Sequence, residues 1–86
     1  MKIQLTRVFV KDFKKLDLKI KKAFIKRKKI FLENAFNSIL KNHSLNGKYS
    51  NFRSINITGD YRAIYYFDKN TKTYFFTKIG THSELY

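Results

Sequence analysis

Residues 61–79 have the sequence YRAIYYFDKNTKTYFFTKI. Both ends of this stretch are rich in aromatic and β-branched residues, which favour β-strands. Its centre, DKNT at residues 68–71, has the composition of a tight turn. The pattern therefore predicts two strands, over 61–67 and 73–79, that follow one another directly and pair antiparallel.

A third strand is predicted immediately upstream of this pair. Phe52, Ile55 and Ile57 supply apolar residues to a short extended run over 52–57, and TGD at residues 58–60 is typical of a turn. Three consecutive strands with short connections form an antiparallel meander. The C-terminal half of the chain is therefore predicted to be a three-stranded sheet.

The N-terminal half changes to helical periodicity. Residues 2–5 alternate polar and apolar side chains, which predicts a short strand. Thr6 is a candidate helix N-cap and predicts a helix near 7–16, and Asp17 is a second candidate that predicts a helix over 18–33. Because the connection between the two helices is minimal, we expect them to form an antiparallel hairpin.

Residues 34–40 contain a short apolar patch that predicts a third, short helix. The expected fold class is therefore α+β, with an N-terminal strand, a helical hairpin and a short third helix packed on an antiparallel sheet. At 86 residues the chain is expected to form a single domain over residues 1–86. Its hydrophobic residues (43%) and aromatic residues (17%) are sufficient for a core at this size.

The chain is strongly basic. Nineteen Lys and Arg against six Asp and Glu give a formal net charge of +13, and residues 1–29, with twelve basic and two acidic side chains, carry +10 of it. Such a field attracts polyanions: nucleic acid, an acidic protein or an anionic membrane surface. The densest run consists of Lys26, Arg27, Lys28 and Lys29. It either follows a phosphate backbone or forms a solvated helix face.

Cysteine is absent, so no disulfide framework and no thiolate metal site are expected. No apolar run approaches the roughly 20 residues that a membrane span requires, and no signal-peptide pattern is present. We therefore expect a cytoplasmic location, no membrane partner and no cofactor.

His82 is the first candidate for chemistry. Histidine transfers protons near neutral pH, which RNA cleavage by attack of the 2′-hydroxyl on the adjacent phosphate requires. A solvated histidine near a frayed terminus is the alternative. Tyr86, four residues further on, is suited to stack on a base or to bond a phosphate oxygen, or else to close the sheet as a hydrophobic plug.

Three cations are candidates for stabilising phosphate charge in the transition state. Arg62 and Lys78 are on neighbouring predicted strands, and Arg53 is on the strand before them. Each also fits a solvated surface charge. Arg53 has a further structural alternative, an ion pair with Glu33 or Glu84.

The sequence DYR at residues 60–62 places a carboxylate, a ring and a guanidinium after a glycine turn. Asp60, Tyr61 and Arg62 are expected at one end of the sheet, where they meet the loop that carries His43. His43 is a second candidate acid or base, a candidate phosphate ligand, or a solvated loop residue. No carboxylate or histidine lies at ligand spacing to His43 or His82, so no metal site is expected.

Several of these segments share a family pattern. The run RSINITGDYRAIY at 53–65 and the run IGTHSELY at 79–86 resemble the RelE/ParE toxin superfamily, and most closely its YafQ-like branch. The segments NAF at 34–36 and LKNHSLNG at 40–47 fit the same branch. The resemblance covers nearly the whole chain, and the C-terminal GTHSEL-aromatic run is its most specific part.

The resemblance implies the toxin of a type II toxin–antitoxin pair, an endoribonuclease that enters the ribosomal A site and cuts mRNA without a metal. The catalytic histidine of the branch falls on His82, the terminal aromatic on Tyr86 and the loop histidine on His43. The pair of acid and aromatic residue after the turn falls on Asp60 and Tyr61. The implied partners are mRNA, ribosomal RNA and a cognate antitoxin, through which operator DNA is bound.

Two cations complete the resemblance, and three positions depart from it. Arg62 matches the arginine of RelE-like members, and Lys78 stands where the branch usually has arginine. A lysine is a point charge in place of a bidentate fork, which weakens oriented phosphate contact. Asn56 replaces a second histidine of the branch, and Ala35 replaces a common proline.

The leading hypothesis is therefore an mRNA-cleaving enzyme with His82 as general acid or base. Arg62, Lys78 and Arg53 stabilise phosphate charge in it, and Tyr86 and Tyr61 position the base. The lysine-rich helices contact ribosomal RNA. Two alternatives remain at this point: a ParE-like inhibitor of DNA gyrase, and a basic RNA-binding module without catalysis.

Overall fold

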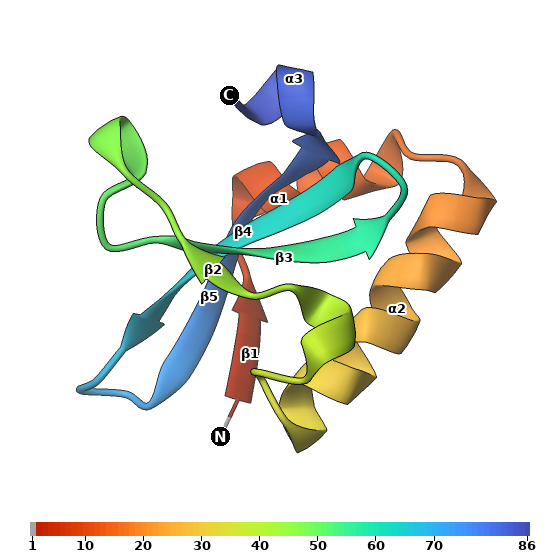
Figure 1. The fold of residues 1–86 in the computed structure, drawn as a ribbon. Helices are drawn as coiled ribbons and strands as arrows, with labels where there is room; N and C mark the ends of the chain where they lie inside the picture. Colours follow the sequence, from red (N-terminus) through yellow and green to blue (C-terminus); the bar gives the residue numbers. More distant parts are fainter. Residues whose placement is uncertain (1) are drawn as a thin grey trace.

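A five-stranded sheet forms the centre of the protein (Figure 1). The computed structural model describes residues 2–86. The strands are arranged in the order β1-β5-β4-β3-β2, with the bounds β1 Lys2–Leu5, β2 His43–Ser44, β3 Arg53–Thr58, β4 Tyr61–Asp68 and β5 Thr73–Thr81. The α+β fold class predicted from the sequence is confirmed.

The C-terminal meander is confirmed, because β3, β4 and β5 pair antiparallel in sequence order. The expectation of an antiparallel sheet holds for the meander and for β2, which pairs antiparallel with β3. It does not hold for β1, which pairs parallel with β5 and makes the sheet mixed. Parallel strands need a long crossover connection, and here the chain between β1 and β5 includes two helices and the other three strands.

Both predicted helix caps are present. Helix α1 spans Arg7–Lys14, and the side chain of Thr6 accepts a hydrogen bond from the backbone N–H of Phe9. Helix α2 spans Leu18–Glu33, and Asp17 accepts in the same way from Ile20. An N-cap oxygen that satisfies a free N–H of the first turn fixes where the helix begins.

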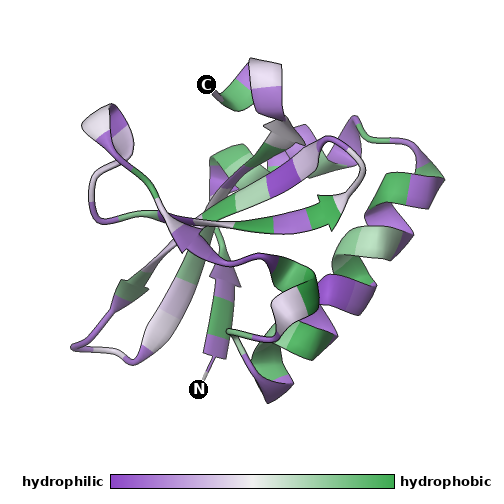
Figure 2. Cartoon of the chain, viewed as in Figure 1, coloured by the Kyte–Doolittle hydropathy of each residue, from purple (hydrophilic) through white to green (hydrophobic). Residues whose placement is uncertain are grey.

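The two helices contact each other and the same face of the sheet. Phe24 of α2 lies 5.5 Å from Phe13 of α1 between ring centroids, and Phe9 of α1 lies 6.2 Å from Phe76 of β5. Phe31 of α2 contacts Tyr65 of β4, with centroids 5.0 Å apart. Figure 2 shows bands of apolar and polar residues along α2. Its buried residues, Ile20, Phe24 and Phe31, recur at helical spacing, so one side of the helix enters the core.

The third predicted helix, over 34–40, is reduced to the 3₁₀ turn η1, Ser38–Leu40. Two asparagines explain this. The side chain of Asn34 accepts from the N–H of Phe36, and that of Asn37 accepts from the N–H of Ile39. These local hydrogen bonds compete with an α-helical backbone. A second turn, η2, covers Gly47–Tyr49.

Strand alternation separates two faces of the sheet. Ile55, Ile57, Ala63 and Tyr65 are buried beneath the helices. The intervening residues point to the other side, which we call the open face because neither α1 nor α2 packs on it; it is defined by Ser54, Asn56, Arg62 and Tyr66. Within residues 2–86, no helix combines the length and apolarity needed to cross a bilayer.

Candidate active site

His82 is the first residue of helix α3, His82–Leu85, which directly follows β5. The side chain of Thr81 accepts from the N–H of Glu84 at 3.3 Å, and the carboxylate of Glu84 accepts from the N–H of Thr81 at 2.7 Å. This reciprocal pair is a capping box, and it fixes the start of the helix on which His82 is carried. The backbone hydrogen bond from Thr81 lowers the pKa of Glu84 below its ordinary value.

Two further contacts hold α3 against the sheet. The backbone N–H of His82 donates to the carbonyl oxygen of Asp60 at 3.1 Å, which ties α3 to the turn between β3 and β4. Gly80 is the second contact point. A Cβ there would lie 3.0 Å from a carboxylate oxygen of Glu84 and 3.6 Å from the side chain of Leu85. Glycine therefore allows α3 to pack closely on β5.

Arg62 faces Gly80 across the strand pair and points to the open face. Its Nη1 donates to the carbonyl oxygens of Gly59 at 3.1 Å and of Tyr61 at 3.3 Å. These bonds hold the guanidinium against the β3–β4 turn. Because a guanidinium has five donors, the remaining N–H groups stay available for an anion.

His43 is on β2, beside Ser54 of β3. Its Nδ1 lies 2.9 Å from the carbonyl oxygen of Lys41. A carbonyl oxygen only accepts, so Nδ1 donates and the hydrogen of the neutral ring is on this nitrogen. Nε2 of the neutral ring then has a free lone pair, which is the form that a general base requires.

These residues meet at one cavity of about 400 Å³. It is lined by His43, Ser44, Leu45, Asn46, Arg62, His82 and Tyr86. The rings of His82 and Tyr86 lie 4.7 Å apart between centroids. The structure thus brings together four of the residues that the sequence singled out, from β2, β4 and α3.

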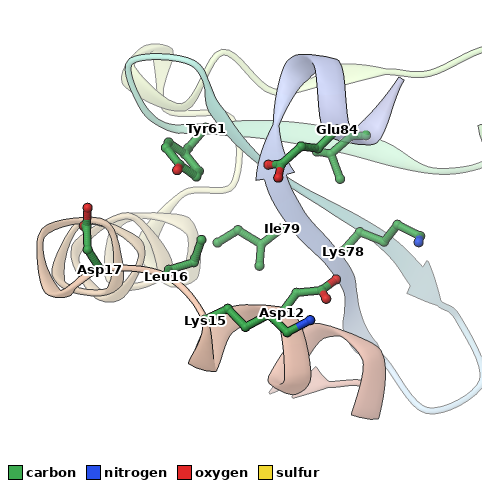
Figure 3. A pocket seen from close by; sticks show the side chains of 9 residues that line it. Asp12, Lys15, Leu16, Asp17, Tyr61, Lys78, Ile79 and Glu84 are labelled. Carbon is green, nitrogen blue, oxygen red and sulfur yellow. The ribbon is translucent and has the colours of Figure 1, made fainter.

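Tyr61 and Lys78 line a different cavity, of about 530 Å³, between α1, β5 and α3 (Figure 3). Asp12, Lys15 and Glu84 also line it. Tyr61 packs against the core because it follows the alternation of Ala63 and Tyr65. Tyr61 therefore does not share the cavity of His43 and Arg62, contrary to the expectation that they meet, and its role in positioning a base stays a prediction. Asp60 lines neither cavity, and its contribution to the site is its backbone carbonyl.

Arg53 is also on the helix-covered side, for the same reason of alternation. Its Nε donates to the side chain of Asn42 at 2.7 Å, and its guanidinium lies 5.2 Å from the ring centroid of Phe36. Asn42 in turn donates to the hydroxyl of Tyr65 at 2.7 Å. Burial raises the pKa of Tyr65. Arg53 therefore contacts Asn42 and Phe36, and it does not line the cavity of His82. Its predicted phosphate contact stays a prediction.

The predicted RNA-binding run on α2 is divided. Lys26 and Arg27 line a cavity of about 350 Å³ together with Lys19 and Lys22, beside the β3–β4 turn. Arg27 also donates to the carbonyl oxygen of Ile39 at 2.8 Å. Lys28 and Lys29 do not line this cavity, because successive helix positions point in different directions.

Sequence reasoning missed the part that residues 44–46 play in lining the His82 cavity. The signal was weak, since β2 has only two residues and both are polar. Residues 2–86 contain no group of three or more His, Cys, Asp or Glu placed to hold a metal ion.

Comparisons with known proteins show related folds. YafQ from E. coli strain BL21(DE3) has a similar structure, with a TM-score of 0.81 and 22% identity over 98% of this chain and 96% of that one. A metal-bound toxin from Helicobacter pylori has a TM-score of 0.75 and 27% identity over 100% of this chain and 99% of that one. A chain of the toxin–antitoxin complex RelBE2 from Mycobacterium tuberculosis has a TM-score of 0.76 and 18% identity over 94% of this chain and 96% of that one.

A comparison with curated proteins found no significant match. A comparison with protein families matched residues 1–86, and the family is described as a bacterial toxin of type II toxin–antitoxin system, YafQ. The match covers the whole chain, including β2, the β3–β4 turn and α3, which form the His82 cavity. The chain therefore belongs to the YafQ family of toxins of bacterial type II toxin–antitoxin systems.

Proposed function

We propose that this toxin is an endoribonuclease that cuts mRNA on the ribosome, by attack of a 2′-hydroxyl on the adjacent phosphate. The observation that carries the proposal is the single cavity lined by His43, Arg62, His82 and Tyr86. Two imidazoles, a guanidinium and an aromatic ring are the groups that this reaction needs, and none of them requires a metal.

The proton transfers are divided between the two histidines in this proposal. The bond from Nδ1 of His43 to the carbonyl of Lys41 supports His43 as the base, because Nε2 is then free to take the 2′-hydroxyl proton. The 2′-oxygen forms a bond to phosphorus while the bond from phosphorus to the 5′-oxygen breaks. His82 gives a proton to the departing 5′-oxygen, which leaves a 2′,3′-cyclic phosphate and a 5′-hydroxyl.

Arg62 supplies the positive charge for the phosphate in this scheme. Its bonds to Gly59 and Tyr61 hold the guanidinium in place before substrate binds, and preorganised donors cost no reorganisation during the reaction. Lys78 is outside the cavity, so Arg62 is assigned the contact with the reacting phosphate.

The wider partners follow from charge and from the family. Lys19, Lys22 and Lys26 around their cavity provide contacts to the phosphates of ribosomal RNA. The structurally similar RelBE2 is a toxin–antitoxin complex, which supports a cognate antitoxin as the inhibitory partner of this toxin. Operator DNA would then be bound through the antitoxin. A cytoplasmic location is consistent with a ribosomal substrate.

Cleavage of a reporter mRNA on purified ribosomes tests the proposal. We expect fragments that end in a 2′,3′-cyclic phosphate, and no cutting where the nucleotide before the scissile phosphate is 2′-deoxy. Intact mRNA would refute the nuclease. Intact mRNA together with trapped gyrase–DNA complexes would establish the gyrase inhibitor instead, and salt-sensitive RNA binding without product would establish the binding module.

A further inference from the structure

A row of aromatic rings leads from the His82 cavity across the open face of the sheet. Beyond His82 and Tyr86, it continues through Tyr49, Phe52, Tyr66 and Phe75. These six residues, from η2, β4, β5, α3 and the segment before β3, are here called the aromatic row. The last four have no part in the proposed chemistry.

The rings form a continuous series of contacts. Tyr86 lies 6.0 Å from Tyr49, and Tyr49 lies 6.1 Å from Phe52, as measured between centroids. Phe52 lies 5.3 Å from Tyr66, which stacks on Phe75 at 5.2 Å with an interplanar angle of 18°. Tyr66 and Phe75 are direct cross-strand partners, so the row crosses the strands and does not run along one of them.

The row is separate from the hydrophobic core. Tyr49, Phe52, Tyr66 and Phe75 are each half-buried, whereas the core beneath the helices contains fully buried rings such as Phe9 and Phe76. Helices α1 and α2 pack on the other face of the sheet (Figure 1). An aromatic surface on a sheet face that carries no long helix is the arrangement with which several RNA-binding domains stack unpaired bases.

The charges around the row favour an anionic ligand. The ammonium of Lys48 lies 5.2 Å from the ring centroid of Tyr49, and Arg62 lies at the His82 end. At the other end, exposed Lys2 pairs with Thr73, two residues before Phe75. Asp68 on β4 is already engaged, because its carboxylate accepts from Asn70 and Thr71 in the β4–β5 turn.

We propose that the aromatic row is a stacking surface for single-stranded RNA that continues from the cleavage cavity. The inference rests on the proposed nuclease function, since it identifies the ligand as the unpaired nucleotides next to the scissile phosphate. Stacking on aromatic side chains tolerates any base, so the row holds the strand without selecting its sequence. Beyond His82, the rings of the row meet edge to face, except for the stacked pair of Tyr66 and Phe75, and together they offer a surface long enough for several nucleotides.

Binding of a short 2′-O-methyl oligoribonucleotide, which this mechanism cannot cut, tests the row directly. The oligonucleotide carries 2-aminopurine at successive positions, whose fluorescence falls when the base stacks. The variants are Tyr66→Leu and Phe52→Leu, with Tyr66→Phe to retain the ring. The matched control is Phe67→Leu, because Phe67 is the next residue on β4 and its ring contacts Tyr74 on the helix-covered face.

We expect Tyr66→Leu and Phe52→Leu to weaken binding about 5- to 10-fold and to restore 2-aminopurine fluorescence. Tyr66→Phe and Phe67→Leu are expected to bind like the wild type, which also shows that a leucine on this strand is tolerated. Equal affinity of Tyr66→Leu and Phe67→Leu would overturn the inference, as would equally tight binding of duplex RNA, whose bases are not free to stack.

The binding assay is independent of catalysis, so the two proposals fail separately. Ring-dependent binding by a protein that leaves mRNA intact would refute the nuclease and retain the aromatic row. If the protein cuts mRNA efficiently and Tyr66→Leu binds the oligonucleotide as tightly as the wild type, the nuclease proposal is retained and the aromatic row is refuted. His82→Ala is expected to lose cutting while it keeps stacking at Phe52 and Tyr66.

Discussion

The rings of His82 and Tyr86 lie 4.7 Å apart between centroids, at an interplanar angle of 53°. A single helical turn creates this contact, because the N–H of Tyr86 donates to the carbonyl oxygen of His82 at 3.0 Å and residues four apart share one side of a helix. The geometry of the candidate acid therefore depends on the integrity of α3.

Tyr86→Ala is expected to lower kcat/KM for mRNA cleavage, while Tyr86→Phe stays close to the wild type. The reason is that the ring is available to stack on a base, a contact worth about 1–3 kcal/mol, or roughly 5- to 150-fold. Single-turnover cleavage on ribosomes measures both variants. If Tyr86→Phe were as impaired as Tyr86→Ala, the hydroxyl and not the ring would be the active group.

Gly80→Ala is expected to impair cleavage by displacing α3. The added Cβ would lie 3.0 Å from a carboxylate oxygen of Glu84, so this oxygen has to move by a few tenths of an ångström, which weakens the capping box and loosens α3. Loss of an N-terminal cap costs about 0.5–2 kcal/mol, and a small displacement of a catalytic group reduces the rate by up to about 100-fold. Thermal unfolding and single-turnover cleavage together check this prediction.

Ser83→Ala is the matched control for this variant, because Ser83 is exposed on the same helix and its hydroxyl lies 3.4 Å from that of Thr81, its one hydrogen-bond partner among residues 2–86. Its rate and stability are expected to match the wild type. Full activity of Gly80→Ala would show that the position of His82 does not depend on close packing of α3.

The stability of α3 is expected to fall in acid through Glu84. The hydrogen bond from Thr81 lowers the pKa of Glu84, so the folded state favours the ionised carboxylate. This contribution is present above the pKa of Glu84 in the unfolded chain, and it is lost as the pH falls through the pKa in the folded state.

Glu84→Gln provides the comparison, because an amide oxygen still accepts a hydrogen bond but does not titrate in this range. As the pH is lowered from neutral, the Tm of the wild type should fall more than the Tm of the variant. Parallel Tm curves for the two proteins would contradict a role for the ionised carboxylate.

Ser54→Ala is expected to leave the protein equally stable or to stabilise it by up to about 1 kcal/mol. Ser54 is fully buried, and among residues 2–86 its hydroxyl has no hydrogen-bond partner. A buried unpaired polar group costs about 1–3 kcal/mol, part of which is offset by the packing that its atoms make. Denaturant unfolding measures the change, and a loss above about 1 kcal/mol would show that the hydroxyl has a partner.

Local signals in the sequence were sufficient for the main elements. The caps at Thr6 and Asp17 gave the starts of both long helices, and the second prediction, 18–33, matches α2 in both bounds. The capping-box pattern of Thr81 and Glu84 was also present and is the signal that could have revealed α3. The parallel pairing of β1 with β5 joins residues about 70 positions apart and left no local signal.

The candidate site was predicted in part. His43, Arg62, His82 and Tyr86 share a cavity. Tyr61, which sequence proximity grouped with Arg62, lines a different one. Adjacent residues on a strand point to opposite faces, so one-residue neighbours are the least suitable partners for a common site. The same alternation, applied to Ile55 and Ile57, would have assigned Arg53 to the helix-covered face.

Single-turnover cleavage of a reporter mRNA on ribosomes by His82→Ala and Arg62→Ala tests the central claim most directly. Lys69→Ala is the control, because Lys69 is an exposed cation in the β4–β5 turn, outside the His82 cavity. We predict losses of about 10²- to 10⁴-fold for His82→Ala and about 10²- to 10³-fold for Arg62→Ala, with Lys69→Ala unchanged. Rates for His82→Ala and Arg62→Ala equal to that of Lys69→Ala would contradict the assignment of this cavity as the active site.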